Sequence, residues 1–188
     1  MFFLLSLVFA GTLTGPAQAE AQKYRLQKLE QAQSMVETLS GEEQANLLMR
    51  MASLEADEAT AQASAGDSAE ASRYFEMAAQ NYQRILLTWP DRAGNDQLHY
   101  LLGQLLILSG KDTEGIAELS SLIKTYPDSS YLFDAYLAIG EYFFEKGKLV
   151  RAVIHSGDEE YHYNFEKPIE IEEAYYSFLV LADYNPVK

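Results

Sequence analysis

Cysteine is absent from the 188-residue sequence, which excludes several chemistries at once. Disulfide bonds cannot stabilise the fold, and neither a thiol nucleophile nor a cysteine-based metal site is possible. The sequence also lacks the Gly-x-Ser-x-Gly motif of serine hydrolases, phosphate-binding glycine loops and the dinucleotide-binding fingerprint. Only three histidines are present. We therefore expect neither an active site nor a cofactor, and we predict that the protein is not an enzyme.

Basic residues and long apolar runs are also scarce. The chain has 14 Lys and Arg against 28 Asp and Glu, a formal net charge of -14, which opposes binding to nucleic acid and to anionic lipid. No apolar run reaches the roughly 20 residues that a transmembrane helix needs. The rest of the composition, 48% hydrophobic and 22% charged, is typical of a globular protein, and the length suits one domain.

The first 19 residues predict export. They contain no charged residue, are apolar through Ala10, and end in Ala17-Gln18-Ala19, the small-x-small pattern of a signal-peptidase site. We predict a signal peptide over residues 1–19, cut before Glu20, although the basic residue that usually follows the first methionine is missing. The mature protein is then expected in the periplasm, with secretion as the alternative.

An internal repeat of 37 residues runs through the middle of the chain. Glycines inside a predicted helix suggest close approach of a neighbouring helix, and a glycine followed by lysine suits the left-handed position that ends a helix. Proline ends a helix and restricts the residue before it. The pattern predicts a helix, a tight turn, a second helix and a proline-terminated turn. The repeated pairs are Gly103 and Gly140, Gly110 and Gly147, Pro90 and Pro127, and Gly115 and Ala152.

These marks resemble the tetratricopeptide repeat (TPR), and the likeness covers residues 70–155 and, weakly, 170–186. His99 stands where that repeat usually has tryptophan, so a packing role is favoured for it over a chemical one. The resemblance implies an all-α fold of stacked antiparallel helix hairpins in a right-handed solenoid, similar to TPR proteins of the bacterial cell envelope. The matching residues are Leu102-Gly103, Leu106, Leu119 and Pro127, then Ile139-Gly140, Phe143, Gly147 and Ala152.

About eight helices are expected after the signal peptide. A first helix over 22–39 and a second opened by a capping box at residues 40–43 form the N-terminal region, 20–65. TPR-like repeats follow over 66–155, with a turn and an Asp-x-x-Glu cap beginning near Gly66. An acidic irregular insertion is expected at 156–168. The last segment, 169–188, is expected to be the final repeat helix, because it repeats an earlier second helix when Pro186 is aligned with Pro127. Truncation of this helix is left open.

The insertion carries imidazole and carboxylate groups that could bind zinc, nickel or manganese. Their spacing matches no known metal motif, and short charged runs are usually solvated, so a loop without metal is favoured. Glu141 and Glu145, one helical turn apart, could suggest an acid and base pair for glycoside cleavage, but side chains so placed more often face water. The possible metal ligands are His155, Asp158, Glu159, Glu160 and His162.

The resemblance also implies a groove lined by the first helix of each repeat, where a partner segment would lie. Its mixture of aromatic and acidic residues suits a basic or amphipathic partner. The alternative is that the apolar members only pack against the neighbouring repeat. The groove positions carried over from the family are Gln97, Tyr100, Gln104, Ile107, Asp134, Leu137, Glu141 and Phe144.

The sequence therefore predicts a non-catalytic periplasmic TPR-like scaffold that mediates protein–protein interactions in cell-envelope assembly or maintenance. A helical domain that binds glycan or peptidoglycan, or the non-catalytic part of a wall-processing enzyme, is the alternative. Thirteen tyrosines and nine phenylalanines keep that alternative open, because aromatic faces stack on sugars.

Overall fold

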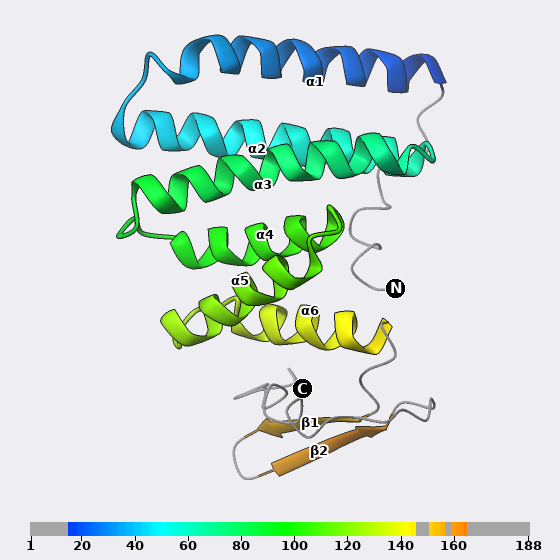
Figure 1. The fold of residues 1–188 in the computed structure, drawn as a ribbon, viewed down its shortest axis with the longest axis vertical. Coiled ribbons are helices and arrows are strands. Elements are labelled where there is room, and N and C mark those ends of the chain that lie inside the picture. The colour runs from blue at the N-terminus through cyan, green and yellow to red at the C-terminus, as the bar shows by residue number, and fades with distance from the viewer. Residues whose placement is uncertain (1–14, 146–150, 157–158, 165–188) are drawn as a thin grey trace. The chain divides into compact units, whose positions relative to one another are not determined.

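The computed structural model describes residues 15–145, 151–156 and 159–164, with side chains from 15 to 143 (Figure 1). Within this part of the chain six α-helices precede one β-hairpin, so the all-α expectation holds through Glu145. The expected final helix over 169–188 lies outside the described residues. The elements are α1 (Gly15–Val36), α2 (Gly41–Ser64), α3 (Ser68–Thr88), α4 (Asn95–Leu108), α5 (Asp112–Thr125), α6 (Leu132–Glu145), β1 (Arg151–Ser156) and β2 (Glu159–Asn164).

The chain divides into two compact units that interleave at α4. The first unit comprises Met1–Asn95 and Leu105–Asp112, and the second comprises Asp96–Gln104 and Thr113–Lys188. Helix α4 therefore contributes its two ends to the first unit and its middle to the second. Each unit is described by itself below.

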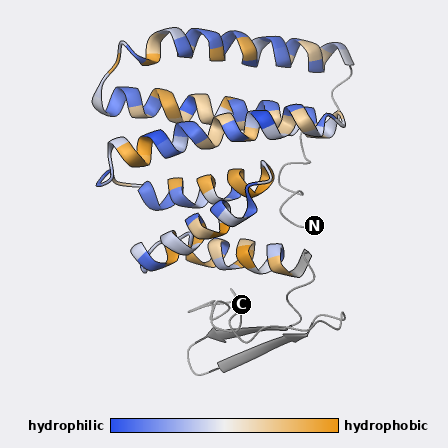
Figure 2. Ribbon diagram, viewed as in Figure 1, coloured by the Kyte–Doolittle hydropathy of each residue, from blue (hydrophilic) through white to orange (hydrophobic). Residues whose placement is uncertain are grey.

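The first unit is built on the long helices α1, α2 and α3, which lie side by side in Figure 1. Short turns join them, so each runs antiparallel to the next. Alanine occupies six of the fourteen buried positions of α2 and α3, and larger side chains fill the others. Polar residues are more frequent along α1 than along α4 and α6 (Figure 2). The apolar core of α1–α3 consists of Leu29, Ala32, Val36, Ala45, Leu48, Met51, Ala52, Ala59, Ala71, Tyr74, Phe75, Ala78, Ala79, Tyr82 and Ile85.

Helix α1 starts earlier than the sequence predicted. It begins at Gly15 rather than residue 22 and ends at Val36 rather than residue 39. Pro16 does not prevent this start, because the first turn of a helix needs no backbone donor from proline. The helix runs through Ala19 and Glu20, where signal-peptide cleavage is predicted, and residues 1–14 lie outside the described part of the chain. Export therefore stays a prediction.

The predicted capping box at the start of α2 is confirmed only in the position of its N-cap. The helix begins at Gly41 with Ser40 as its N-cap, as expected, but the Ser40 side chain makes no capping hydrogen bond. Gly41 has a φ of 58°, a left-handed backbone that departs from the helical first turn that a capping box requires. By contrast, the Asp67 carboxylate accepts a hydrogen bond of 3.0 Å from the Glu70 amide, so the predicted cap of α3 is confirmed.

Gly110 ends α4 in the manner that the repeat predicts. Its φ is 89°, in the region that other residues rarely adopt, and its amide donates to the Ile107 carbonyl at 3.0 Å. The Lys111 amide donates to the Leu106 carbonyl at 2.8 Å, which completes a Schellman motif. The left-handed turn allows α5 to begin at Asp112.

The 37-residue spacing is confirmed in the backbone for the first helix of the unit and for the turn before it. Helix α6 begins 37 residues after α4, and both helices have 14 residues. The proline turns before them also share their hydrogen bonds. In the first turn the backbone hydrogen bonds run from the amide of Trp89 to the carbonyl of Ile85 (2.8 Å), from Arg92 to Trp89 (3.2 Å) and from Asn95 to Arg92 (3.3 Å). The second turn has the same three bonds 37 residues later: from Tyr126 to Leu122 (2.9 Å), from Ser129 to Tyr126 (3.0 Å) and from Leu132 to Ser129 (3.3 Å).

Gly103 permits the close helix packing that its place in the repeat suggested. A Cβ atom at this position would lie 2.6 Å from Cγ of Leu119 and 3.1 Å from the Gly115 carbonyl oxygen. Both neighbours belong to α5, within the second unit. The absence of a side chain therefore allows α4 and α5 to approach closely. For Gly140, the corresponding position in α6, the same role stays a prediction.

The prediction of an irregular insertion over 156–168 is wrong at residues 156 and 159–164, because β1 and β2 form an antiparallel hairpin there. Ala152, which the repeat placed in a second helix, pairs with Tyr163 instead. The local sequence explains the difference. Val153 and Ile154 are β-branched and Tyr161 is aromatic, and such residues favour strands over helices. In the sequence, Gly-Asp separates the two runs, a dipeptide typical of hairpin turns.

Candidate partner-binding surface

Helix α4 carries three of the predicted groove residues within the second unit. Gln97 is exposed and Gln104 is half-buried, whereas Tyr100 is only 7% exposed. The Gln104 amide donates a hydrogen bond of 2.8 Å to the Tyr100 hydroxyl. The Tyr100 ring also stacks on that of Tyr131, with centroids 5.5 Å apart and an angle of 25° between the planes. Tyr100 is thus held in one orientation from two sides.

Helix α6 brings acidic groups to the same tyrosine. Burial raises the pKa of the Tyr100 phenol, and the negative charges of Asp134 and Glu141 raise it further, while the Gln104 hydrogen bond acts the other way. These charges act on the phenol because both carboxylates are near it. The structure therefore brings Tyr100, Gln104, Asp134 and Glu141 together, and it leaves Leu137 half-buried on the same helix.

A serine that sequence reasoning missed ties the start of α6 to the start of α4. The Ser129 hydroxyl donates to the Asp96 carboxylate at 2.6 Å, and the Tyr131 amide donates to the Ser129 hydroxyl at 3.1 Å. This bridge positions Tyr131 immediately before α6. The signal in the sequence was modest: Asp-Ser-Ser after a proline indicates a turn, but it does not identify which hydroxyl crosses to another helix.

Two of the predicted groove residues are not part of this cluster. Ile107 belongs to the segment Leu105–Asp112, which is part of the first unit. The side chain of Phe144 lies outside the described residues, so its role stays a prediction. The cluster in the second unit, which we call the Tyr100 cluster, consists of Gln97, Tyr100, Gln104, Tyr131, Asp134, Leu137 and Glu141.

The burial of Tyr100 changes its role. A side chain that is 7% exposed has little area left for a partner, so Tyr100 packs the interior as the alternative interpretation allowed. Tyr131 is half-buried and stacks on it, and Gln97 is exposed at the edge. An incoming segment would therefore meet the Tyr131 ring and the nearby carboxylates, with Tyr100 supporting them from beneath. Such a surface suits cations and hydrogen-bond donors.

His99 packs against α5 instead of facing the Tyr100 cluster. Its Nδ1 lies 2.5 Å from Oε1 of Glu118, and its ring centroid is 5.5 Å from that of Tyr126. Both partners belong to the second unit, and all three side chains are half-buried. These contacts fit the packing role that the sequence favoured for this histidine.

The first unit holds two buried carboxylates that sequence reasoning missed. Glu58 is 0% exposed, and its carboxylate accepts hydrogen bonds from Gln22, Arg25 and Gln62 at 2.7, 2.8 and 2.6 Å. Burial acts to raise the pKa of Glu58, but these three donors and the Arg25 charge together hold it below its ordinary value. Glu58 is therefore a charged group that joins α1 to α2.

Glu55, one turn earlier on α2, has the opposite character. It is 1% exposed and accepts a hydrogen bond of 2.7 Å from the uncharged amide of Asn81 on α3. Burial raises the pKa of Glu55 to about 7, and the Asn81 hydrogen bond offsets this only in part. The sequence did hold a signal for both acids. Glu55 follows Met51 by four residues and Leu48 by seven, so it falls on the apolar face of the helix.

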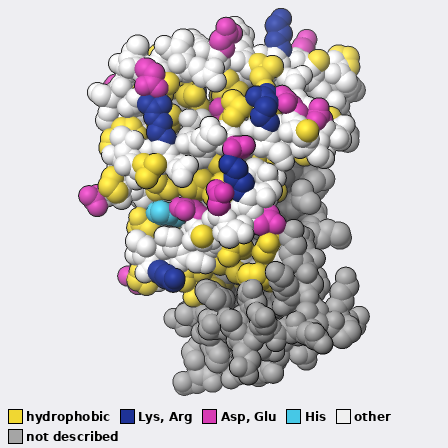
Figure 3. Space-filling view, in the orientation of Figure 1, with side chains coloured by type: hydrophobic (Ala, Val, Ile, Leu, Met, Phe, Trp, Pro, Cys, Tyr) yellow, Lys and Arg dark blue, Asp and Glu magenta, His cyan; other side chains and the backbone are white. Residues whose placement is uncertain are grey.

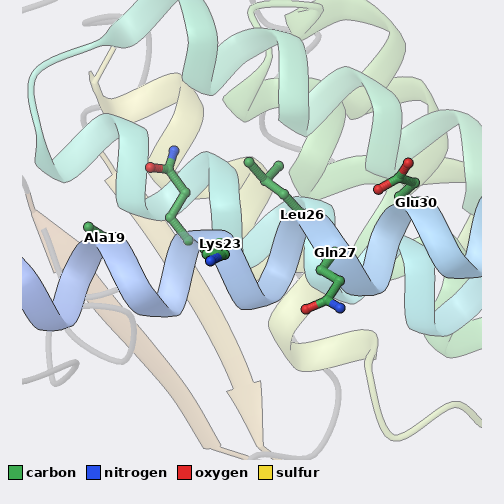
Figure 4. A pocket seen from close by; sticks show the side chains of 6 residues that line it. Ala19, Lys23, Leu26, Gln27 and Glu30 are labelled. Atoms are coloured by element: carbon green, nitrogen blue, oxygen red, sulfur yellow. The ribbon is translucent and has the colours of Figure 1, made fainter.

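Two shallow hollows lie on the first unit. One follows a single face of α1, where the side chains of Ala19, Lys23, Leu26, Gln27 and Glu30 stand along the helix (Figure 4). The other lies at the turn after α3, beside Trp89, Pro90 and the Arg92 guanidinium, which pairs with Glu42 at 2.8 Å. Acidic and basic side chains lie next to one another over these helices (Figure 3). Neither hollow gathers a set of groups typical of catalysis.

Among the described side chains, no group of three or more His, Asp or Glu is arranged to hold a metal ion. The possible ligands at residues 155–162 lie where side chains are not described. No helix in the described ranges is long and apolar enough to cross a bilayer.

Comparison with known proteins gave no match. No protein-family model fits the chain, and neither a curated protein nor a solved structure matches it. The repeat and the Tyr100 cluster are therefore the features of the chain that bear on its function.

Proposed function

We propose that the protein is a non-catalytic scaffold of TPR-like helix hairpins, exported to the periplasm, which binds protein partners in cell-envelope assembly or maintenance. The observation that carries the proposal is the 37-residue repeat, with equal helices α4 and α6 and the same hydrogen bonds in the turns before them. Successive helices at a regular spacing that present side chains to one side are typical of an interaction scaffold.

The charge of the second unit favours a basic partner. Residues 96–104 and 113–143 contain six acidic residues (Asp or Glu) and only one Lys or Arg, which is Lys124. Two of these acids, Asp134 and Glu141, are near the Tyr100 phenol. A segment with Lys or Arg beside apolar residues would complement both the carboxylates and the Tyr131 ring.

Site-specific crosslinking in intact cells tests the proposal. A photoreactive residue would replace Gln97, the exposed member of the Tyr100 cluster, and a matched control would replace Gln33, which is exposed on α1. Crosslinked proteins would be identified by mass spectrometry. We expect a defined envelope protein to be captured from position 97 and not from position 33. Equal capture at both positions, or none at 97, would contradict the proposed surface.

The captured partner then allows a quantitative test. Asp134→Asn and Glu141→Gln together remove two charges and preserve the side-chain shapes, so we expect the Kd to rise about tenfold. Glu30→Gln with Glu43→Gln, which neutralises two exposed acids of the first unit, should leave the Kd unchanged. A Kd that is insensitive to Asp134 and Glu141 would show that the partner does not use these carboxylates.

A glycan-binding role is the second candidate. Tyr131 is half-buried and Phe133 is 37% exposed at the start of α6, and aromatic rings can stack on sugars. Salt separates the two candidates, because attraction between charges weakens as ionic strength rises whereas stacking does not. Binding to isolated peptidoglycan that persists at high salt and is lost in Tyr131→Ala would favour the glycan.

A further inference from the structure

Glu55 and Glu58 lie one helical turn apart on α2 and face opposite neighbours. The Glu58 carboxylate accepts from the guanidinium of Arg25 on α1 at 2.8 Å, whereas the Glu55 carboxylate accepts from the amide of Asn81 on α3 at 2.7 Å. Both residues are at most 1% exposed to solvent. Helix α2 is thus joined to α1 by an ion pair between Glu58 and Arg25. It is joined to α3 by a hydrogen bond to Glu55 from the uncharged amide of Asn81.

The other titratable groups around Glu55 do not supply the missing positive charge. From α3, burial raises the pKa of Tyr82, and the negative charges of Asp57 and Glu55 add to that effect. On α2 itself, Asp57 and Glu58 are acidic. From α1, Arg25 pairs with Glu58 and also acts on Asp57. None of these groups would offset the charge of an ionised Glu55.

We propose that Glu55 is a pH-sensitive switch in the packing of α3 on α2: the protonated carboxyl holds the two helices together, and its ionisation loosens them. The geometry supplies the reason. A neutral carboxyl can accept from Asn81 in an apolar setting at little cost, while a buried carboxylate without a positive partner is unfavourable. The proposal concerns the first unit alone and does not depend on the proposed partner binding.

The direction of the pH effect follows from the proton balance. In the folded protein the Glu55 pKa is about 7, against an ordinary value of 4.5. Between these two values the folded state keeps a proton that the unfolded state has lost. The stabilisation is complete below pH 4.5 and is lost as pH rises through 7. Because each pKa unit is a tenfold change in the equilibrium constant, the full effect is of order 100-fold.

Glu58 provides a matched control of opposite sign. Its pKa is held below the ordinary value, so its contribution is present above that value and is lost only on acidification below it. Between pH 5.5 and 8 Glu58 stays ionised, and its neutralisation should change stability without changing the pH dependence. Glu55 and Glu58 lie on the same helix and are almost equally buried. A comparison of their variants therefore isolates the effect of the groups around each carboxyl.

Amide hydrogen exchange of the full chain at pH 5.5 and 8.0, corrected for the intrinsic dependence of exchange on pH, tests the switch. In the wild type we expect protection of α2 and α3 to fall between 10-fold and 100-fold on going to pH 8.0. In Glu55→Gln this loss should disappear. In Glu58→Gln protection should be lower at both pH values with the wild-type dependence retained. Amides of α5 and α6, in the second unit, serve as the internal reference.

Two results would overturn the proposal: the same pH dependence in Glu55→Gln as in the wild type, or no loss of protection in the wild type at pH 8.0. A second measurement covers the case in which Glu55→Gln does not fold. Carboxyl-carbon NMR of wild-type protein labelled at glutamate should show one resonance titrating with a midpoint near 7. If every glutamate titrates near 4.5, Glu55 is not the switch.

Discussion

The helices α1–α3 and the hairpin α4–α5 achieve stability by different means. In α1–α3 the apolar core is interrupted by ionisable and amide side chains, and Glu58 joins α1 to α2 through Arg25. In the hairpin the key contact is apolar and steric, because Gly103 lets Leu119 approach without a side chain between them. In α1–α3 polar side chains thus join neighbouring helices, whereas in α4–α5 the absence of a side chain at Gly103 lets the helices pack closely.

The largest effect is expected from Arg25. Arg25→Met removes the guanidinium and keeps an apolar stem, which leaves the fully buried Glu58 carboxylate with amide donors alone. Removing one member of a buried pair costs about 3 kcal/mol, so we expect that loss in the free energy of unfolding, measured with urea at pH 7. Lys23→Met, at an exposed position of the same helix, should cost little. Equal stability of the two variants would show that the buried pair is not important for α1.

A smaller effect is expected from Gly103. Alanine favours a helix by about 1 kcal/mol over glycine, but its Cβ would lie 2.6 Å from Cγ of Leu119. Overpacking of this kind typically costs 1–3 kcal/mol, so Gly103→Ala should lose about 1 kcal/mol net in urea unfolding. The same change made in a Leu119→Ala background should cost less, because the clash is gone. Additive losses would indicate that Gly103 does not control the helix separation.

The smallest effect is expected from the ion pair between Arg84 and Glu37, which lies on the surface of the first unit. The two side chains are 39% and 68% exposed, and their closest atoms are 2.8 Å apart. Solvent and salt screen such pairs, so Arg84→Ala should leave the Tm within experimental error. A clear drop in Tm that disappears in 1 M salt would show that surface charge contributes more than the buried contacts suggest.

The sequence predicted the repeat because its marks are local. Pro90 and Gly110 act through the backbone of their own turn. A structural role for Gly103 is indicated because a glycine recurs 37 residues later. The start of α3 was equally predictable, because the Asp67 cap involves residues three apart. Features of this kind depend on few neighbours, so they can be recognised without knowing the tertiary structure.

The parts that the sequence did not reveal depend on distant partners. Glu55 needs Asn81, 26 residues away, and Ser129 needs Asp96, 33 residues away, so neither contact has a local signal. The hairpin β1–β2 was missed for another reason. The repeat register placed Ala152 in a helix, and this outweighed the strand preference of Val153 and Ile154. Repetition in the sequence is thus a guide to structure only where the local preferences agree with it.

The division of α4 between two units has a practical consequence for dissecting the protein. The first unit needs Leu105–Asp112, while the intervening Asp96–Gln104 belongs to the second. No single stop codon or start site can therefore yield one whole unit free of the other. A truncation after residue 95 removes the whole second unit and also takes Leu105–Asp112 from the first. Point substitutions are therefore the better way to assign function along this chain.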